Sequence, residues 1–328
     1  MISKIPSAGF QDNVKFRNII INSDMSISQR ATSQASITSS GYYTADRWRL
    51  GVDTAGTWTQ TQSTDVPTAQ GFQKSTKLDC TTANASLGTG NILYFEQLFE
   101  GQNLQYLKKG TSDAVSTTLS FWVRSNKTGT YICELQDVDN TRQISKSYTI
   151  SSADTWEKKT ITFPGDTTGA LDNDNTVGLT LNFWLVAGSD FTSGTLQTSW
   201  GSLTSANRAV GQVNLADSTS NEWYVTGVQL EAGQTASEFE FLPTGVMESL
   251  CQRYYIKIPN TLYGGVYGST TSFSGGILPT TMRAVPSVSY SSVRTTTGLG
   301  FYPSKDKIQV IMTATNGFVT GLEGDAEL

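Results

Sequence analysis

Closely spaced carboxylates are the residues of this sequence that could do acid–base chemistry, because the chain contains no histidine. Histidine is the commonest general base and transition-metal ligand, so its absence excludes most catalytic triads and many metal centres. Two acid pairs remain, Glu96 with Glu100 and Asp137 with Asp139. Glycoside hydrolysis needs two such acids facing each other across a cleft. Solvated surface positions explain both pairs better, so we expect no enzymatic activity.

Two tryptophans, Trp122 and Trp184, are candidates for contact with a ligand. Each lies in a segment of alternating apolar and polar residues, on the face opposite the apolar row. An aromatic ring in such a position can stack against a sugar ring. The favoured alternative is that a neighbouring subunit or a loop covers the ring, as usually happens to apolar patches on assembly proteins.

An oxygen-rich loop is a candidate calcium site. It contains Asp166, Asp172 and Asp174, with Asn173 and Asn175 among them, and calcium prefers carboxylate and amide oxygens. The order of residues lacks the glycine and the bidentate glutamate of an EF-hand loop. A solvated turn is therefore the favoured alternative. A structural calcium ion is the only candidate for a cofactor.

The composition is typical of a β-protein and of one large or two modest domains. The 328 residues are 37% hydrophobic and 16% charged, which provides a sizeable core. Serine, threonine and glycine are plentiful, and helix-forming residues never dominate a long window. The net charge of −5 provides no basic surface for phosphates, so we expect no nucleic-acid partner.

Cysteine usage and hydropathy indicate where the protein is made. The three cysteines, at 80, 133 and 251, form no zinc-binding spacing and fit reduced thiols in a core. The first ten or so residues contain no signal-peptide-like apolar run, and no apolar stretch is long enough to span a membrane. We expect synthesis in a cytoplasm and no membrane insertion.

Period-two alternation predicts three amphipathic strands at residues 117–124, 177–187 and 222–231. In the third strand we expect Tyr224, Thr226, Val228 and Leu230 to share one face. Turn residues separate these strands from others, which favours an antiparallel β-sandwich over a parallel α/β sheet. Residues 91–108 are expected to form a loop with a single helical turn.

The most specific pattern lies between residues 226 and 255. It reads TGVQLEAG from residue 226, then Phe239-Glu240, Pro243 and CQRYY from residue 251. This long, ordered pattern resembles the tail-fibre-type structural proteins of bacteriophages. Residues 18–30, the Asp-Arg-Trp run at 46–48 and residues 163–169 resemble the same family. The resemblance thus extends over residues 18–290, with Ser23 where the family more often has glycine.

The resemblance implies an antiparallel jelly-roll β-sandwich, similar to carbohydrate-binding modules, in a virion protein that is usually a homotrimer. We therefore expect an N-terminal arm at 1–17 that docks on a neighbouring virion protein, and the sandwich at 18–245. A short helix and a small C-terminal β module follow at 246–328. Five signature positions are expected to be structural: Gln229, Glu231, Gln252, Arg253 and Tyr254. Glu231 is expected to pair with Arg253 or Arg47.

The first functional hypothesis is therefore a virion structural protein of a tail fibre or surface fibre. It would be made in the bacterial host cytoplasm, released by lysis, and could adhere to a bacterial surface glycan. One alternative is a capsid decoration or head-fibre protein with no adhesion role. Another is a polysaccharide-degrading tailspike, which would require a parallel β-helix and a clustered acid pair. A secreted glycan-binding module is disfavoured because no signal peptide is seen.

Overall fold

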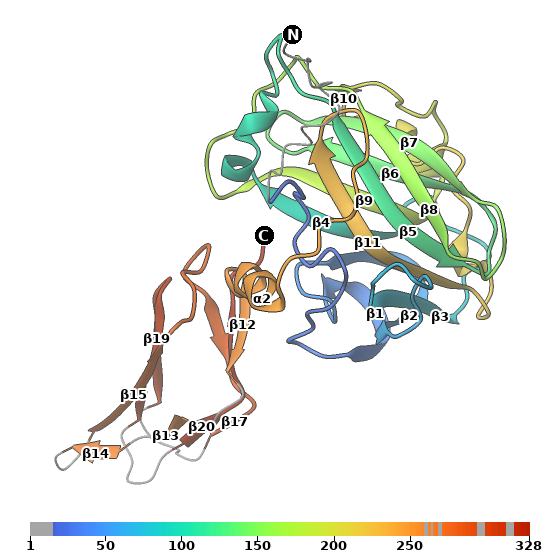
Figure 1. Ribbon diagram of the computed structural model, residues 1–328. Coiled ribbons are helices and arrows are strands. Elements are labelled where there is room, and N and C mark those ends of the chain that lie inside the picture. The colour runs from blue at the N-terminus through green and yellow to red at the C-terminus, as the bar shows by residue number, and fades with distance from the viewer. Residues whose placement is uncertain (1–15, 259–261, 264, 268–270, 294–298, 313–317) are drawn as a thin grey trace, which may run out of the picture.

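The computed structural model describes residues 16–258, 262–263, 265–267, 271–293, 299–312 and 318–328 (Figure 1). The described chain forms a large β-sandwich, a short helix and a smaller β module (Figure 1). Residues 1–15 of the expected N-terminal arm lie outside the described residues, so its docking role stays a prediction. No helix in the described ranges is long and apolar enough to cross a membrane.

One antiparallel sheet of eleven strands folds back on itself to form the sandwich. The first layer contains, in spatial order, β10 (Gly201–Ser202), β7 (Arg142–Ile150), β6 (Gly129–Asp137), β9 (Val177–Ala187), β4 (Ile92–Glu100) and the start of β2 (Arg49–Ser63). The second layer contains the end of β2, then β3 (Ser75–Thr82), β11 (Glu222–Ala232), β5 (Thr117–Ser125) and β8 (Glu157–Phe163). Strand β1 (Ser33–Tyr42) pairs with β2. The predicted all-β, antiparallel jelly-roll architecture is confirmed.

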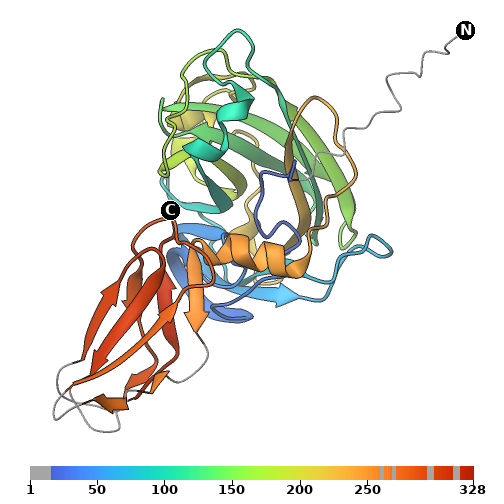
Figure 2. The same ribbon diagram turned by 60° about the vertical axis from the view of Figure 1, so that its left-hand side comes forward.

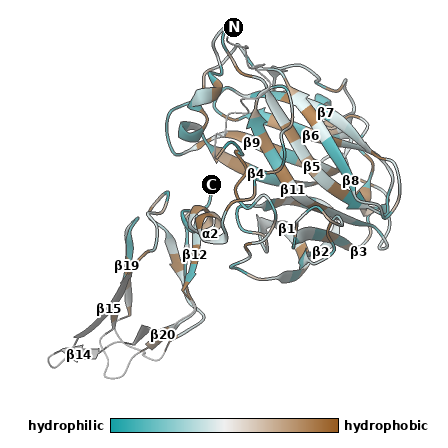
Figure 3. Ribbon diagram, in the orientation of Figure 1, coloured by the Kyte–Doolittle hydropathy of each residue, from teal (hydrophilic) through white to brown (hydrophobic). Residues whose placement is uncertain are grey.

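The core lies between the two layers, because alternate side chains of the facing strands are apolar. Phe183 of β9 packs on Phe121 of β5, with ring centroids 5.0 Å apart. Phe95 of β4 approaches Trp223 of β11 at 6.0 Å, and Trp48 stacks on Phe95 at 4.7 Å. Hydrophobic and hydrophilic residues mix along the strands (Figure 3), as this alternation requires.

The three alternating strands predicted from the sequence are β5, β9 and β11, and their ends lie within one residue of the predicted ones. Strand β4 was not predicted, because Leu93, Gln97 and Leu98 have helical spacing, although Leu93 and Phe95 follow the period of a strand. The expected helical turn follows β4 instead, as two 3-10 turns, η2 (Gly101–Asn103) and η3 (Gln105–Leu107).

A β-bulge changes the faces of β11. Its pairing with β5 shifts register between Thr226 and Gln229, and Gly227 between them has a φ of 61°, which glycine adopts without strain. Trp223 and Val225 therefore enter the core before the bulge, and Val228 and Leu230 enter it afterwards. The prediction that Tyr224 and Thr226 share a face with Val228 and Leu230 is wrong for this reason.

The helix and the C-terminal module follow the sandwich. Helix α2 (Thr244–Gln252) lies between the two parts (Figure 2), and its buried residues are Met247 and Cys251. The first small sheet contains β12 (Tyr255–Ile258), β21 (Leu322–Asp325) and β16 (Ser287–Ser289). The second contains β13 (Leu262–Tyr263), β20 (Phe318–Thr320) and β17 (Ser292–Val293). The third contains β14 (Gly265–Tyr267), β15 (Thr271–Ile277), β19 (Lys307–Met312) and β18 (Gly300–Pro303).

The module has a hydrophobic core separate from that of the sandwich. Ile256, Leu278, Ile308 and Leu322 are among its buried members. Each part therefore buries its own apolar side chains, and charged pairs such as Arg253–Glu100 and Arg47–Glu327 join the two.

Candidate functional site

Trp184 lies on the outer face of the first layer, where the segment after β9 covers it. This segment, residues 188–214, contains α1 (Ser189–Thr192) and the 3-10 turn η4 (Ser205–Asn207). The Phe191 ring lies 5.4 Å from the Trp184 ring, and the Arg208 guanidinium lies 5.0 Å above it. Trp184 is fully buried, so the prediction of an exposed sugar platform at this residue is wrong. The loop that covers it corresponds to the favoured alternative.

The acids predicted to be solvated are buried and paired with cations. Glu96 pairs with Arg49 across two strands, and burial raises the pKa of Glu96. Glu100 and Asp137 are fully buried as well. The expected surface positions of these three acids are therefore wrong. A sequence pattern does not show this, because each cation comes from a distant segment.

Asp139 is half-buried and accepts the backbone N–H of Asp172 at 2.9 Å. An unpredicted acid, Glu134 of β6, accepts two hydrogen bonds from Arg208, each at 2.8 Å. Glu134 also accepts the indole N–H of Trp184 at 3.0 Å. Each of these five acids thus binds a neighbouring loop or strand.

The predicted calcium ligand Asp166 is held by two cationic side chains. It accepts hydrogen bonds from Arg142 at 2.7 and 3.0 Å, and the Lys109 ammonium lies 3.1 Å away. Burial alone would raise the pKa of Asp166, but the bonds from Arg142 and Lys109 hold it below its usual range. Lys109 also pairs with Asp137 and donates to the carbonyl oxygen of Gly169 at 2.8 Å. The ammonium thus occupies the centre of an oxygen cluster.

The other two predicted calcium ligands point elsewhere. The Asp174 carboxylate accepts the backbone N–H of Thr176 at 2.8 Å, which caps a local turn. The backbone N–H of Asp172 donates to Asp139, and the Asp172 side chain is exposed. No group of three or more metal-ligating side chains occurs in the part of the chain that the structure describes. The three aspartates therefore do not form the predicted calcium site.

An aromatic and charged strip lies on the outer face of the second layer. Tyr224 of β11 is packed against Trp156, with ring centroids 6.1 Å apart, and the Arg124 guanidinium lies 4.8 Å above Tyr224. Arg124 bonds Asp154 at 3.1 Å and also pairs with Asp65. The indole N–H of Trp156 donates to Asp65 at 2.8 Å. None of these residues was a predicted site residue.

Trp122 extends this strip along β5. In the antiparallel register it lies opposite Thr226 of β11 on one side and Lys158 of β8 on the other. Its neighbours in sequence, Phe121 and Val123, are fully buried in the core, so Trp122 points outward as predicted. The ring is half-buried, and it is the predicted ligand contact that remains reachable from solvent.

The signature residues Gln229 and Glu231 fasten the segment after β11. Gln229 accepts the backbone N–H of Glu240 at 2.8 Å, and Glu231 accepts that of Ser237 at 2.8 Å. Gln229 in turn donates to Glu231 at 2.8 Å. The nearest cation to Glu231 is Arg17, at 3.7 Å. The bonds from Gln229 and Ser237 fix the start of the connection to helix α2.

The predicted pairing of Glu231 with Arg253 or Arg47 is wrong. Glu231 lies on the outer face of the second layer, whereas both arginines lie near the end of β4 in the first layer. The third signature residue, Gln252, donates to Glu248 at 3.3 Å within α2.

Arg253 and Tyr254 join the module to the sandwich. The Arg253 guanidinium donates two hydrogen bonds to Glu100, at 2.9 and 2.7 Å, and the Tyr254 hydroxyl donates a third at 2.6 Å. The Arg47 guanidinium stacks 3.5 Å from the centre of the Tyr254 ring and pairs with Glu327 near the C-terminus. We call these five residues the joint. The contacts of Arg253 and Tyr254 with Glu100 and Arg47 were not predicted, because these residues are remote in sequence.

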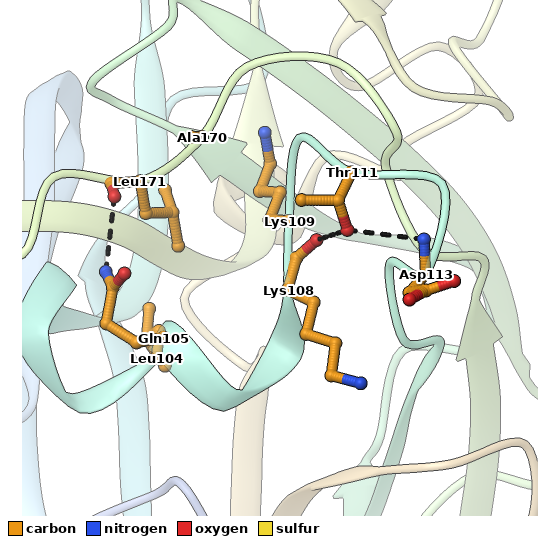
Figure 4. A pocket seen from close by; sticks show the side chains of 8 residues that line it. All are labelled: Leu104, Gln105, Lys108, Lys109, Thr111, Asp113, Ala170 and Leu171. Atoms are coloured by element: carbon orange, nitrogen blue, oxygen red, sulfur yellow. Dashed lines mark hydrogen bonds between the residues drawn. The ribbon is translucent and has the colours of Figure 1, made fainter.

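A surface cavity of about 420 Å³ lies beside η3 (Figure 4). Leu104 and Leu171 line it, and Gln105 donates to the Leu171 carbonyl oxygen at 3.2 Å. The Thr111 hydroxyl donates to the Lys108 carbonyl oxygen at 2.8 Å. The hydrogen bonds drawn in Figure 4 thus hold the loops themselves together.

No protein-family model and no curated protein matches the sequence. The bacteriophage CBA120 tailspike protein 4 enzymatically active domain is a distant structural likeness, at 14% identity and a TM-score of 0.34, over 66% of this chain and 21% of that chain. A protein from Bacteroides thetaiotaomicron described as sugar-binding has 11% identity and a TM-score of 0.37, over 66% and 99% of the chains. TmCBM61 in complex with beta-1,4-galactotriose has 9% identity and a TM-score of 0.33, over 66% and 99%. TM-scores this low establish no family.

Proposed function

We propose that this chain is a non-enzymatic structural protein of a bacteriophage particle, of the tail-fibre or surface-fibre type. It assembles as a homotrimer with other virion proteins and adheres to a bacterial surface glycan. It is made in the host cytoplasm and released by lysis. The observation that carries this proposal is the joint, which uses Arg253 and Tyr254 of the pattern that resembles phage fibre proteins.

The joint suits a protein that transmits force between its parts. Glu100 is fully buried and receives three charge-assisted or hydroxyl hydrogen bonds from the module. Bidentate arginine–carboxylate bonds fix direction as well as distance, so they restrict rotation of one domain against the other. Arg283 of the module adds a bond to the Asn175 carbonyl oxygen of the sandwich at 2.9 Å.

The state of the acids supports a structural role over hydrolysis. Glu96, Glu100, Glu134 and Asp137 each bind a cationic side chain. A retaining or inverting glycosidase needs one acid that exchanges protons with substrate and a second carboxylate facing it. Carboxylates committed to buried ion pairs are poorly suited to that task, because proton exchange would break the pairs.

Immunogold electron microscopy of particles from lysed host cells tests the virion assignment. Antibodies raised against the purified chain should label fibres on the tail or the capsid surface. Light scattering of the purified protein should give a mass three times the 35.5 kDa of one chain. Unlabelled particles would refute the virion role, and a monomeric mass would refute the trimer.

Binding of the purified protein to intact host cells tests adhesion separately. We expect the protein to sediment with the cells, and to lose this binding when the surface polysaccharide is removed enzymatically. If antibodies label the particles but the purified protein does not bind host cells, the decoration alternative is supported instead. Release of reducing ends from the polysaccharide would support the tailspike alternative.

A further inference from the structure

Trp122 is the one tryptophan of seven that has no hydrogen-bond or ring partner among the described residues. Trp48 and Trp58 illustrate the usual case, since their indole N–H groups donate to carbonyl oxygens at 3.1 and 2.8 Å. Trp223 packs on Phe95 and Phe183. Trp122 therefore presents both a π-face and a free N–H donor.

The residue opposite Trp122 is a cation that pairs with none of the described residues. Trp122 pairs with Lys158 in the β5–β8 register, and directly opposed side chains of an antiparallel pair have Cβ atoms about 5 Å apart. Lys158 is exposed and forms no ion pair or hydrogen bond in the described ranges. Its neighbour Lys159, in contrast, is bound to Glu157 at 2.5 Å. A single uncompensated positive charge thus lies beside the indole.

Hydroxyl groups continue the same face along the two strands. Ser120 of β5 lies opposite Thr160 of β8, and Thr118 lies opposite Thr162. Thr160 is exposed, and β8 ends the described sheet on this side. Residues 233–240 return over the far end of this face, where Thr118 and Thr162 donate to the carbonyl oxygens of Gly233 and Gln234, and Ser120 and Thr118 are buried there. The accessible part of the face therefore combines the Trp122 ring, the Lys158 ammonium and the Thr160 hydroxyl.

We propose that this face of β5 and β8 binds an acidic saccharide, with Trp122 stacking on the sugar ring and Lys158 pairing with its carboxylate. The inference rests on the proposed adhesion role and names its ligand class. The C–H-rich face of a pyranose matches the indole, and its hydroxyls match Thr160. One free lysine complements one negative charge, which is the charge of a hexuronate. Arg124 adds no free charge, because Asp65 and Asp154 compensate it.

Each such contact is weak alone, because the ion pair is exposed to solvent. A homotrimer that presents three copies of the face to one polysaccharide gains affinity through effective concentration. The polymer is therefore the better probe than the monosaccharide.

The test uses the full-length protein with polygalacturonate, polyglucuronate and alginate as probes, and uncharged galactan as the matched neutral polymer. Affinity electrophoresis and titration calorimetry should detect binding to at least one polyuronate, weakened by added salt. We expect Trp122→Ala to weaken this binding by about tenfold or more, as loss of an aromatic platform does. Lys158→Gln should weaken it about three- to fivefold and remove most of the salt dependence.

Matched controls come from exposed residues elsewhere on the sandwich. Tyr106→Ala removes a ring that is 50% exposed, and Lys108→Gln removes one positive charge. Both should bind like the wild type, and thermal melts should show that all four variants are folded.

Three results obtained with the purified protein and these polymers would overturn the inference. These are no binding to any of the three polyuronates, equal losses in the variants and their controls, or dissociation of the oligomer in Trp122→Ala, which would make Trp122 a subunit contact. Host-cell adhesion that survives both Trp122→Ala and Lys158→Gln would also overturn the inference, while leaving the proposed adhesion role intact. Failure of the wild type to bind cells would refute that role itself.

Discussion

Arg253 donates two hydrogen bonds to the carboxylate of Glu100, at 2.9 and 2.7 Å, although the two residues lie 153 positions apart in the sequence. Burial alone would raise the pKa of Glu100, but bonds from Arg253 and Tyr254 hold it below its usual value of 4.5. The depressed pKa means that the folded state favours the charged carboxylate. The stability from this pair is present above about pH 4.5 and is lost as the pH falls through the lower folded pKa.

Arg253→Ala should lower the free energy of unfolding by about 3 kcal/mol, because it leaves the fully buried Glu100 without its cation. Urea denaturation followed by tryptophan fluorescence measures this loss. Lys127→Ala is the control, since its pair with Asp217 is partly exposed to solvent, unlike Glu100, and should contribute less than about 1 kcal/mol. Equal losses in the two variants would mean that the joint contributes no more than a surface ion pair.

Asp46 should give the protein a second, opposite pH dependence. Burial raises the pKa of Asp46 to about 6, although hydrogen bonds from Gln29 oppose the shift. A raised folded pKa contributes stability that is fully present below the unfolded value of 3.8 and is lost as the pH rises through about 6. Asp46→Asn should therefore flatten the stability profile between about pH 4 and 6, by an amount on the order of 1–3 kcal/mol.

Urea midpoints measured across this pH range check the prediction for Asp46. Asp154→Asn is the control, because Asp154 is exposed and the variant leaves Asp46 in place. That control should keep the wild-type slope. An unchanged slope in Asp46→Asn would show that another group titrates there.

The strands were predictable from the sequence where one face is apolar and the register is regular. Strand β9 shows this, because Leu179, Leu181, Phe183 and Leu185 alternate without interruption and its observed ends are the predicted ones. Strand β11 was predicted in extent but not in its faces, since the bulge at Gly227 switches sides midway. A local period cannot reveal such a switch, because the bulge is defined by pairing with β5.

The candidate site was less predictable, because burial and pairing come from remote segments. The outward direction of Trp184 was predicted correctly, yet residues 188–214 return over its ring. The same holds for Asp166, whose partner Lys109 lies 57 positions earlier and occupies the space expected for a metal ion. That Trp122 has no hydrogen-bond or ring partner among the described residues also becomes clear only from the structure, because it depends on the neighbours of all seven tryptophans.

Gly227→Ala should destabilise the sandwich, because an added Cβ would lie 2.4 Å from the Phe72 ring and the φ of 61° disfavours alanine. We expect a loss of about 2 kcal/mol or more. Gly245→Ala is the matched control, since it is in helix α2 and no atom of the described residues outside that helix's own backbone lies within 4 Å of the added Cβ. Alanine there should be neutral or stabilise by up to about 1 kcal/mol. Thermal denaturation of both variants measures the contrast.

Calcium should have no effect on the wild type but should stabilise a variant without Lys109. The Lys109 ammonium bonds the carbonyl oxygens of Thr168 and Gly169, at 3.1 and 2.8 Å, and the carboxylates of Asp137 and Asp166. Lys109→Ala leaves two buried carboxylates with one fewer cation, which should cost about 3–5 kcal/mol. The freed oxygens are of the kind that calcium prefers, so excess calcium should restore part of the loss.

Melting temperatures measured with excess calcium and with a chelator distinguish the wild type from Lys109→Ala. Lys146→Ala is the control, because Lys146 donates to the Thr198 carbonyl oxygen and pairs with no carboxylate among the described residues. Its stability should not respond to calcium. A calcium response in the wild type would contradict the assignment of Lys109 as the cation of this cluster. A destabilised Lys109→Ala that magnesium restores as well as calcium would indicate charge neutralisation rather than coordination, since magnesium demands a tighter octahedral geometry.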